Sequence, residues 1–179
     1  MTQASGTARL TVPVSQRDHQ QGPATAPVTL VEYGDYECPY CGEAYPIVKE
    51  IQRRLGDRMR FVFRNFPLTQ SHPHAQHAAE AAEAAAVQGK FWEMHDLLFP
   101  RQAALDAGHL LAYVRELELD AVRVERELEQ EVYRARVRHD IESGLQSGVS
   151  GTPMFFINGR RHEEPGDART LQAALLRAT

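Results

Sequence analysis

Hydrophobic and polar residues follow changing patterns along the first third of the chain. Val28–Gly34 begins with a β-branched, almost wholly apolar run, which is typical of a strand buried on both faces. From Pro39 the apolar residues recur at helical spacing until Gly56, a residue type that commonly ends helices. Met59–Arg64 then alternates between polar and apolar residues, which indicates a second strand. This order predicts a βαβ unit.

The middle of the chain, residues 71–148, shows helical patterning and no strand pattern. Helices are expected over residues 71–87, 91–99, 106–117 and 120–144. Asp106 and Asp120 are typical N-cap residues for the last two of them. The buried side of the last helix is expected to comprise Leu128, Val132, Val137, Ile141 and Leu145.

Strand patterning returns near the C-terminus. Met154–Ile157 is apolar, Asn158-Gly159 is a dipeptide preferred by two-residue hairpin turns, and Arg160–Glu163 is the expected returning strand. Asp167 is expected to cap a final helix. The whole order predicts an α/β fold in which one central sheet is interrupted by a helical insertion.

These patterns also divide the chain into domains. Residues 1–27 are polar, and they predict a partly flexible N-terminal arm with one short strand at Ala8–Val14. Residues 28–70 and 149–179 are predicted to form the sheet domain, and residues 71–148 the helical insertion.

Composition and charge exclude several classes of protein. The 179 residues include 20 Lys and Arg against 24 Asp and Glu, a net charge of −4, without the clustered positive surface that nucleic-acid binding needs. No apolar run approaches the roughly 20 residues that cross a bilayer, so membrane insertion is not expected. The N-terminal region lacks the apolar segment of a secretory signal. A cytoplasmic location is therefore expected, with a processed exported form as the alternative.

Both cysteines lie in one Cys-x-x-Cys, Cys38 to Cys41, at the predicted strand-to-helix corner. If Cys38 is the N-cap, Pro39 is the first helical residue, where its missing N–H is harmless. The sulfur of Cys38 then accepts hydrogen bonds from the helix start, which favours a thiolate and lowers the pKa of the thiol. Cys38 is therefore predicted to be the exposed nucleophile and Cys41 the shielded resolving thiol.

Other uses of the cysteines remain alternatives. Cys38 and Cys41 suit half of a zinc site, with His72, His74 and His77 as further ligands. A histidine-rich helix start is more often a solvated segment, so no metal is assigned. An inert buried pair is disfavoured, because a Cys-x-x-Cys beside a βαβ pattern is a redox signal in its own right.

The segment Val28–Cys41 (VTLVEYGDYECPYC), the later Gly151–Pro153 and the helical insertion between them resemble the DsbA-like thioredoxin-fold disulfide oxidoreductases. The resemblance covers residues 27–178. It implies a thioredoxin fold, with a central mixed sheet flanked by helices, and a cis peptide bond at Thr152–Pro153. It also implies that Thr152 and Pro153 bind substrate, and Pro39 and Tyr40 join them as candidate substrate-binding residues.

Glu32 is the third candidate catalytic residue. It shares a strand face with the apolar Val28 and Leu30, so its carboxylate is expected to be buried. It also lies six residues before Cys38, a position that carries a buried acid in the family that the chain resembles. A buried carboxylate with a raised pKa suits the removal of the proton from a shielded thiol. A solvated Glu32, with Asp35 or Glu37 as the proton acceptor, is the alternative.

The predicted function is thiol–disulfide exchange with proteins or small thiols, without an organic cofactor. Partners are expected to be thiol- or disulfide-containing proteins, glutathione or a redox partner protein. Tyr40 stands where the strongly oxidising member of the family has histidine, which predicts a less oxidising couple. The alternatives are a glutathione-linked reductase or transferase-like relative, and a non-enzymatic metal or iron–sulfur module that uses Cys38 and Cys41.

Overall fold

The structure is a computed structural model that describes residues 8–163 and 168–179. Its strands are β1 (His19–Gln21), β2 (Val28–Gly34), β3 (Met59–Asn65), β4 (Met154–Ile157) and β5 (Arg160–Arg161). They form one sheet in the order β1-β3-β2-β4-β5. β2 and β3 are parallel and the other neighbours are antiparallel, so the predicted mixed sheet is confirmed.

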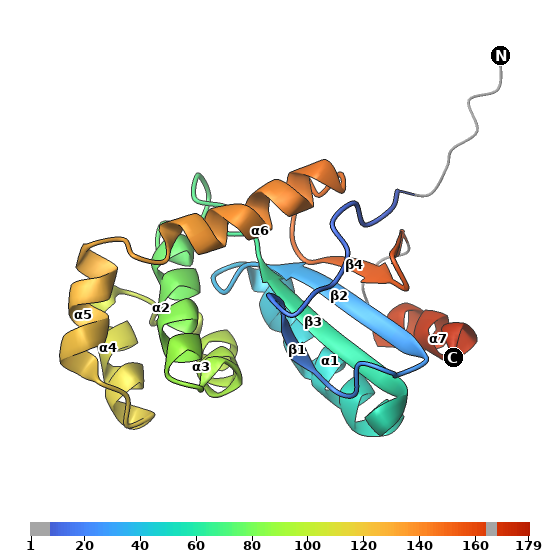
Figure 1. Ribbon diagram of the computed structural model, residues 1–179, viewed down its shortest axis with the longest axis horizontal. Coiled ribbons are helices and arrows are strands. Elements are labelled where there is room, and N and C mark those ends of the chain that lie inside the picture. Colours follow the sequence, from blue (N-terminus) through green and yellow to red (C-terminus); the bar gives the residue numbers. More distant parts are fainter. Residues whose placement is uncertain (1–7, 164–167) are drawn as a thin grey trace, which may run out of the picture.

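Helices flank the sheet and form a separate group at one end of it (Figure 1). Those in the described part of the chain are α1 (Pro39–Leu55), α2 (Ala75–Val87), α3 (Phe91–Leu98), α4 (Ala107–Glu116), α5 (Ala121–Glu129), α6 (Arg134–Gln146) and α7 (Ala168–Ala178). α1 and α7 pack together on one face of the sheet, and α6 packs near β3 on the other. α2 to α5 pack on one another beside the sheet, and are called the helical group below.

The two faces of the sheet contribute to different apolar clusters. Because side chains alternate along a strand, Leu30 and Glu32 of β2 lie on the face that α1 and α7 cover, called the first face. Val31 and Tyr33 lie on the second face, where they pack with α6 and with residues of the N-terminal segment. Both faces are therefore buried, as the apolar start of β2 predicts.

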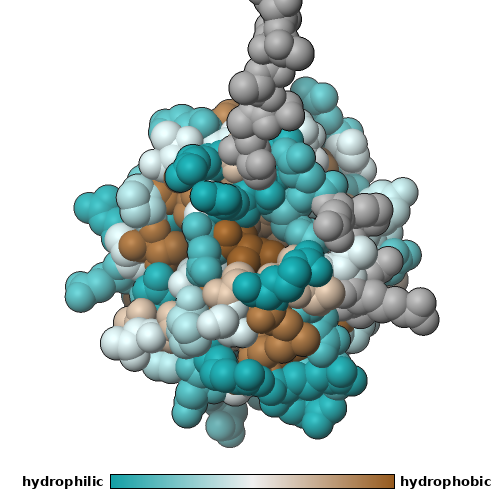
Figure 2. Space-filling model, turned by 90° about the vertical axis from the view of Figure 1, so that its right-hand side faces the viewer, coloured by the Kyte–Doolittle hydropathy of each residue, from teal (hydrophilic) through white to brown (hydrophobic). Residues whose placement is uncertain are grey.

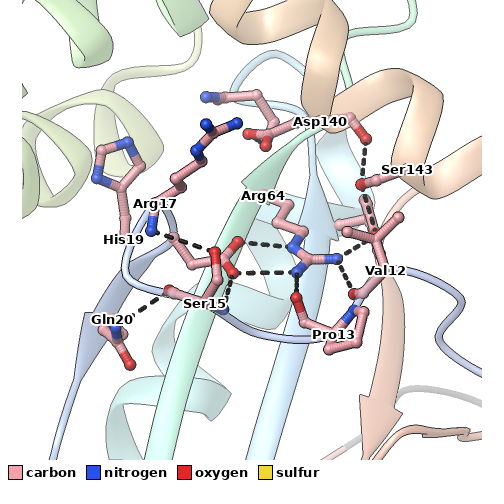
Figure 3. A network of polar contacts seen from close by, with 12 residues as sticks. Val12, Pro13, Ser15, Arg17, His19, Gln20, Arg64, Asp140 and Ser143 are labelled. Atoms are coloured by element: carbon pink, nitrogen blue, oxygen red, sulfur yellow. Dashed lines mark hydrogen bonds and ion pairs between the residues drawn. The ribbon is translucent and has the colours of Figure 1, made fainter.

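Arg64 of β3 ties the N-terminal segment to the second face (Figure 3). Its guanidinium donates to both carboxylate oxygens of Asp18, at 2.7 and 3.0 Å, and to the carbonyl oxygens of Val12 and Pro13. A further bond of 2.8 Å reaches the hydroxyl of Tyr33. These contacts engage all five N–H donors of an arginine. Burial raises the pKa of Asp18, but the hydrogen bond from Arg64 and its charge outweigh this and lower it.

The N-terminal segment contains a strand that the sequence pattern did not predict. β1 pairs with β3 although no strand was expected at residues 19–21, and the strand expected at Ala8–Val14 is reduced to an isolated bridge between Arg9 and Arg160. The buried salt bridge between Arg64 and Asp18, which holds this segment, could not be predicted from the pattern of hydrophobic residues. Asp167, the expected cap of α7, lies outside the described residues.

Other differences concern helix boundaries. The long helix expected over 120–144 is two helices, α5 and α6, because Glu131 adopts a positive φ of 52° between them. The break turns the faces of the two helices relative to each other, and Val132 and Leu145 of the expected buried side are 50% and 60% exposed. β5 is shorter than expected, but Asn158 and Gly159 have the positive φ values of the predicted hairpin turn.

The side of the molecule that carries β4 and α7 shows patches of apolar residues separated by hydrophilic ones (Figure 2). Within residues 8–163 and 168–179, none of the helices combines the length and the apolar character needed to span a bilayer.

Candidate active site

The predicted strand-to-helix corner places both cysteines at the start of α1. β2 ends at Gly34, residues 35–37 turn beside the helical group (Figure 1), and Cys38 is the N-cap with Pro39 in the first helical turn. The turn is closed by a bond from the backbone N–H of Cys38 to the carbonyl of Asp35 at 3.2 Å. The N-cap position is confirmed; the sulfur of Cys38 makes no capping hydrogen bond of normal geometry, although the N–H groups of Tyr40 and Cys41 still act on its pKa.

Both thiols are free and both are buried, which corrects the expectation of an exposed Cys38. Cys38 is 3% exposed and Cys41 is fully buried. The reason is the loop before β4, which brings the carbonyl oxygen of Thr152 to 3.5 Å from the sulfur of Cys38. On the other side, the backbone N–H of Asp35 donates to the sulfur of Cys41 at 3.4 Å.

The two thiols differ in acidity rather than in exposure. A hydrogen bond from Cys41 lowers the pKa of Cys38 to about 5 against the opposing effect of burial, and the N–H groups of Cys41 and Tyr40 add to the lowering. The pKa of Cys41 is raised well above its ordinary value by burial, by its hydrogen bond to Cys38 and by the charge of Glu32. One sulfur is therefore a thiolate at neutral pH while its neighbour keeps its proton.

Glu32 lies on the first face, and its carboxylate is buried as predicted. The residue is 2% exposed, and its Oε1 has no hydrogen-bond partner within the described ranges. Burial raises the pKa of Glu32 to about 8, and the negative charge of Cys38 adds to the rise. Space around the carboxylate is tight, since a Cβ at Gly34 would lie 3.2 Å from Oε1. A carboxyl group with this raised pKa can take up or release a proton close to neutral pH.

Asp35 and Glu37, the alternative proton acceptors, are held by hydrogen bonds to the chain that leads into α2. Asp35 Oδ2 accepts from the backbone N–H of Leu68 at 2.8 Å and pairs with Nδ1 of His72 at 2.7 Å. Glu37 accepts from the backbone N–H of His74 at 2.7 Å and pairs with its Nδ1 at 2.8 Å. Their carboxylates are committed to the loop, which favours Glu32 as the proton acceptor.

α2 begins at Ala75, later than the expected start at Ser71–Pro73, and the residues before it are bonded to Asp35 and Glu37. Burial lowers the pKa of His72, but the hydrogen bond and charge of Asp35 outweigh this and raise it. His72 and His74 therefore pair with the carboxylates of Asp35 and Glu37, which lie in the turn of residues 35–38, called the redox turn below, and not with the thiols. Among the described residues, no group of three or more Cys, His, Asp and Glu side chains is arranged to hold a metal ion.

The loop before β4 supplies the other residues predicted to contact substrate. The Thr152–Pro153 peptide bond is cis, as the resemblance implies. Pro153 lines a cavity of about 350 Å³ together with Met154, Phe155 and Arg161 among other residues. Tyr40, which lies between the two cysteines in the chain, is 69% exposed. The exposed ring of Tyr40, next to Cys38 and Cys41 in the chain, and the cavity beside Pro153 are the accessible features near the pair.

Comparison with known sequences identifies a family. The family described as Thioredoxin matches residues 15–176 of the chain. Two curated relatives are the Na(+)/H(+) antiporter NhaA 3 of Salinispora tropica, 50% identical over 98% of this chain, and the Na(+)/H(+) antiporter NhaA 1 of Salinispora arenicola, 49% identical over 98%. The chain spans only 27% of the length of each of these relatives.

Solved structures share the fold over nearly the whole chain. Oxidised BdbD from Bacillus subtilis has a TM-score of 0.84 at 24% identity, covering 97% of this chain and 98% of that one. A thioredoxin-like oxidoreductase from Silicibacter pomeroyi has a TM-score of 0.80 at 28% identity, covering 92% and 93%. DsbA2 from Pseudomonas aeruginosa has a TM-score of 0.70 at 26% identity, covering 94% and 96%.

Proposed function

The chain belongs to the thioredoxin family and has the fold of the DsbA-like oxidoreductases, and from this premise we propose that it exchanges disulfides with protein or small thiol substrates through Cys38 and Cys41. The observation that carries the proposal is the placement of two free thiols at one helix start, Cys38 at the N-cap with a lowered pKa and Cys41 buried in the first turn with a raised one. A redox pair needs this asymmetry, because one sulfur attacks the substrate and the other releases it.

The reaction begins with attack by the Cys38 thiolate on one sulfur of a substrate disulfide. The new bond is Cys38 to substrate, the substrate disulfide breaks, and the leaving sulfur takes up a proton from solvent. Cys41 then transfers its proton to Glu32 and attacks the sulfur of Cys38. The mixed disulfide breaks, the second substrate sulfur leaves as a thiolate that takes up a proton from solvent, and Glu32 releases its proton to solvent. The substrate is reduced by two electrons and Cys38–Cys41 is oxidised; the reverse sequence oxidises a dithiol.

Glu32 is assigned the proton transfer because its pKa of about 8 lies between those of the two thiols. A carboxylate with the ordinary pKa is too weak a base to deprotonate a buried thiol. Burial raises the pKa of the carboxyl group and so brings it closer to that of the thiol. The unpartnered Oε1 leaves the carboxylate able to accept the proton. Thr152, Pro153, Pro39 and Tyr40 are assigned to substrate binding: the carbonyl oxygen of Thr152 lies 3.5 Å from the sulfur of Cys38, Pro153 follows it, and Pro39 and Tyr40 are the residues between the two cysteines.

The reduction potential should be intermediate. A thiolate with a pKa of about 5 is less stabilised than that of DsbA (about 3.5) and more than that of thioredoxin (about 7). Because a stabilised thiolate favours the reduced form, we expect a potential between the approximate values of −270 mV for thioredoxin and −120 mV for DsbA. Equilibration with glutathione buffers measures it.

Substitution of each cysteine tests the proposal. Cys38→Ser should abolish exchange with a disulfide substrate, whereas Cys41→Ser should still attack and accumulate a mixed disulfide that mass spectrometry detects. Alkylation of the reduced wild type with limiting reagent should label Cys38 first. Preferential labelling of Cys41, or a trapped adduct only in Cys38→Ser, would reverse the assignment.

The names of the curated relatives suggest a candidate partner. Because this chain matches about a quarter of their length, their antiport activity is not carried over to it. We propose instead that an Na⁺/H⁺ antiporter is one of the proteins on which such a domain acts. Mass spectrometry of the adducts that Cys41→Ser traps in native membranes tests this: an antiporter peptide linked to Cys38 supports the partnership, and adducts with other proteins alone contradict it.

A further inference from the structure

The side chain of Gln102 reaches from the helical group to the redox turn. It follows the 3₁₀ turn Phe99–Arg101, and its Nε2 donates to the carbonyl oxygens of Tyr36 at 2.9 Å and Cys38 at 2.7 Å. Both hydrogens of the amide are thereby used. The Cys38 carbonyl also accepts from the backbone N–H of Gly42 at 3.0 Å, within α1. One side chain thus links the turn before the nucleophile to the first turn of its helix.

The missing side chain at Gly42 makes this contact possible. A Cβ there would lie 2.1 Å from Oε1 and 2.7 Å from Cδ of Gln102. Gly42 is inside α1, where alanine is more favourable than glycine. The helical backbone at position 42 therefore does not require glycine. The close approach of the Gln102 side chain is what leaves no room for a Cβ there.

The contact acts on the charge of Cys38. Its carbonyl oxygen carries a partial negative charge on the same residue as the thiolate, and a hydrogen-bond donor on that oxygen offsets the repulsion. The amide also fixes the carbonyls of Tyr36 and Cys38, so that the N–H groups at the start of α1 keep their direction toward the sulfur. Both effects favour the thiolate.

We propose that Gln102 is a positioning residue for the redox pair, holding residues 36–38 against α1 so that the Cys38 thiolate is favoured. The biological meaning of this role rests on the proposed function, but its effect on the acidity of Cys38 is measurable without a substrate. Gln102 itself touches no reacting sulfur and acts through the backbone of Cys38.

The test compares Gln102→Ala with wild type by ultraviolet absorbance of the thiolate across pH and by equilibration with glutathione. The pKa of Cys38 should rise by about one unit, which shifts the equilibrium roughly tenfold toward the Cys38–Cys41 disulfide. Gln76→Ala is the matched control, because the amide of Gln76 contacts Glu80 within α2 at 3.3 Å. It should leave both quantities at their wild-type values.

Gly42→Ala provides an independent route to the same state, because the added methyl group meets only the end of the flexible Gln102 side chain. It should reproduce the shift of Gln102→Ala, and the double variant should show no further shift. Folded single variants with the wild-type pKa and equilibrium would overturn the positioning role, as would shifts that add in the double variant. A wild-type protein that does not exchange disulfides would instead contradict the proposed function. That result is independent of the pKa titrations, which need no substrate.

Discussion

The two faces of the central sheet bury charge in opposite ways. On the first face, Glu32 has an oxygen without a partner in the described part of the chain, and its pKa is raised to about 8. On the second face, Arg64 uses all its donors and the pKa of its partner Asp18 is lowered despite burial. The register sets Glu32 opposite Phe63 and Tyr33 opposite Arg64, so the two sites are one residue apart along the sheet.

The difference shows how the same sheet provides both a fixed support and a reactive site. A buried charge with every hydrogen bond satisfied holds its partners in place and does not titrate near neutral pH. Burial disfavours the charged form of a carboxylate that lacks hydrogen-bond partners, so its pKa rises. A carboxylate with a raised pKa can accept the proton of a thiol. Substitutions on each face should therefore have separate consequences, for stability on one and for redox chemistry on the other.

The largest expected effect is on the second face. Arg64→Met leaves the Asp18 carboxylate buried without its partner and should lower the free energy of unfolding by about 3–5 kcal/mol. Urea denaturation measures the change. Asp18→Asn combined with Arg64→Met should recover part of the loss, because no charge remains unpaired. A loss below about 1 kcal/mol, the value of an exposed pair, would contradict this assignment.

The next effect is the pH dependence of stability in the reduced protein. Between pH 4.5 and 8 folded Glu32 binds a proton that the unfolded chain has lost, so its contribution falls as pH rises through this window. Cys38 has the opposite sign: its folded pKa of about 5 lies below the ordinary 9.0, so its contribution rises with pH in between. Each slope approaches about 1.4 kcal/mol per pH unit.

The pH dependences contributed by Glu32 and Cys38 have opposite signs and partly cancel in the wild type. Substituting one of the two residues removes its contribution and leaves the other. Relative to wild type, Glu32→Gln should gain stability as pH rises from 5 to 8, and Cys38→Ser should lose it. Denaturant titrations at several pH values give both differences. Identical pH profiles for wild type and Glu32→Gln would show that the carboxylate does not titrate in this window.

A smaller effect is expected from a charge added beside the reactive face. Tyr40 is 69% exposed, so Tyr40→His changes little packing. An imidazolium there should lower the pKa of Cys38 by about one unit and make the couple more oxidising. Tyr40→Phe is the neutral control and should leave both the pKa and the potential unchanged. A shift of equal size in Tyr40→Phe would assign the effect to the hydroxyl rather than to charge.

The smallest effect concerns His72, which pairs with Asp35 beside the redox turn. The charge of Cys38 contributes to the raised pKa of His72, and the coupling acts equally in the other direction. His72→Asn should therefore raise the pKa of Cys38 by a few tenths of a unit, roughly the size of a partly screened interaction. His139→Asn on the exposed surface of α6 is the control. Equal thiol titrations for the two variants would remove His72 from the site.

Local signals made much of the fold predictable from the sequence. The βαβ order, Cys38 as N-cap and the turn at Asn158-Gly159 depend on neighbouring residues, and the structure confirms them. The buried Glu32 was predictable as well, because the alternation along β2 places it on an apolar face.

Features that depend on distant residues were not predictable in this way. Gln102 lies more than sixty positions from its acceptors, and the Asp35–His72 pair spans thirty-seven. The break between α5 and α6 depends on a positive φ at Glu131, a residue type that gives no local signal for it. Burial of Cys38 follows from the loop at Thr152, which only the folded chain brings onto the sulfur.

The most direct test of the redox site is a stopped-flow measurement of the two chemical steps across pH in wild type and Glu32→Gln. If Glu32 accepts the proton of Cys41, the resolution rate of wild type rises with pH through a transition near 8, set by the pKa of the carboxylate. In Glu32→Gln, resolution should be slower at neutral pH and this transition should disappear, while attack by Cys38 stays nearly unchanged. An unaltered resolution rate and pH profile in Glu32→Gln would contradict the role of Glu32.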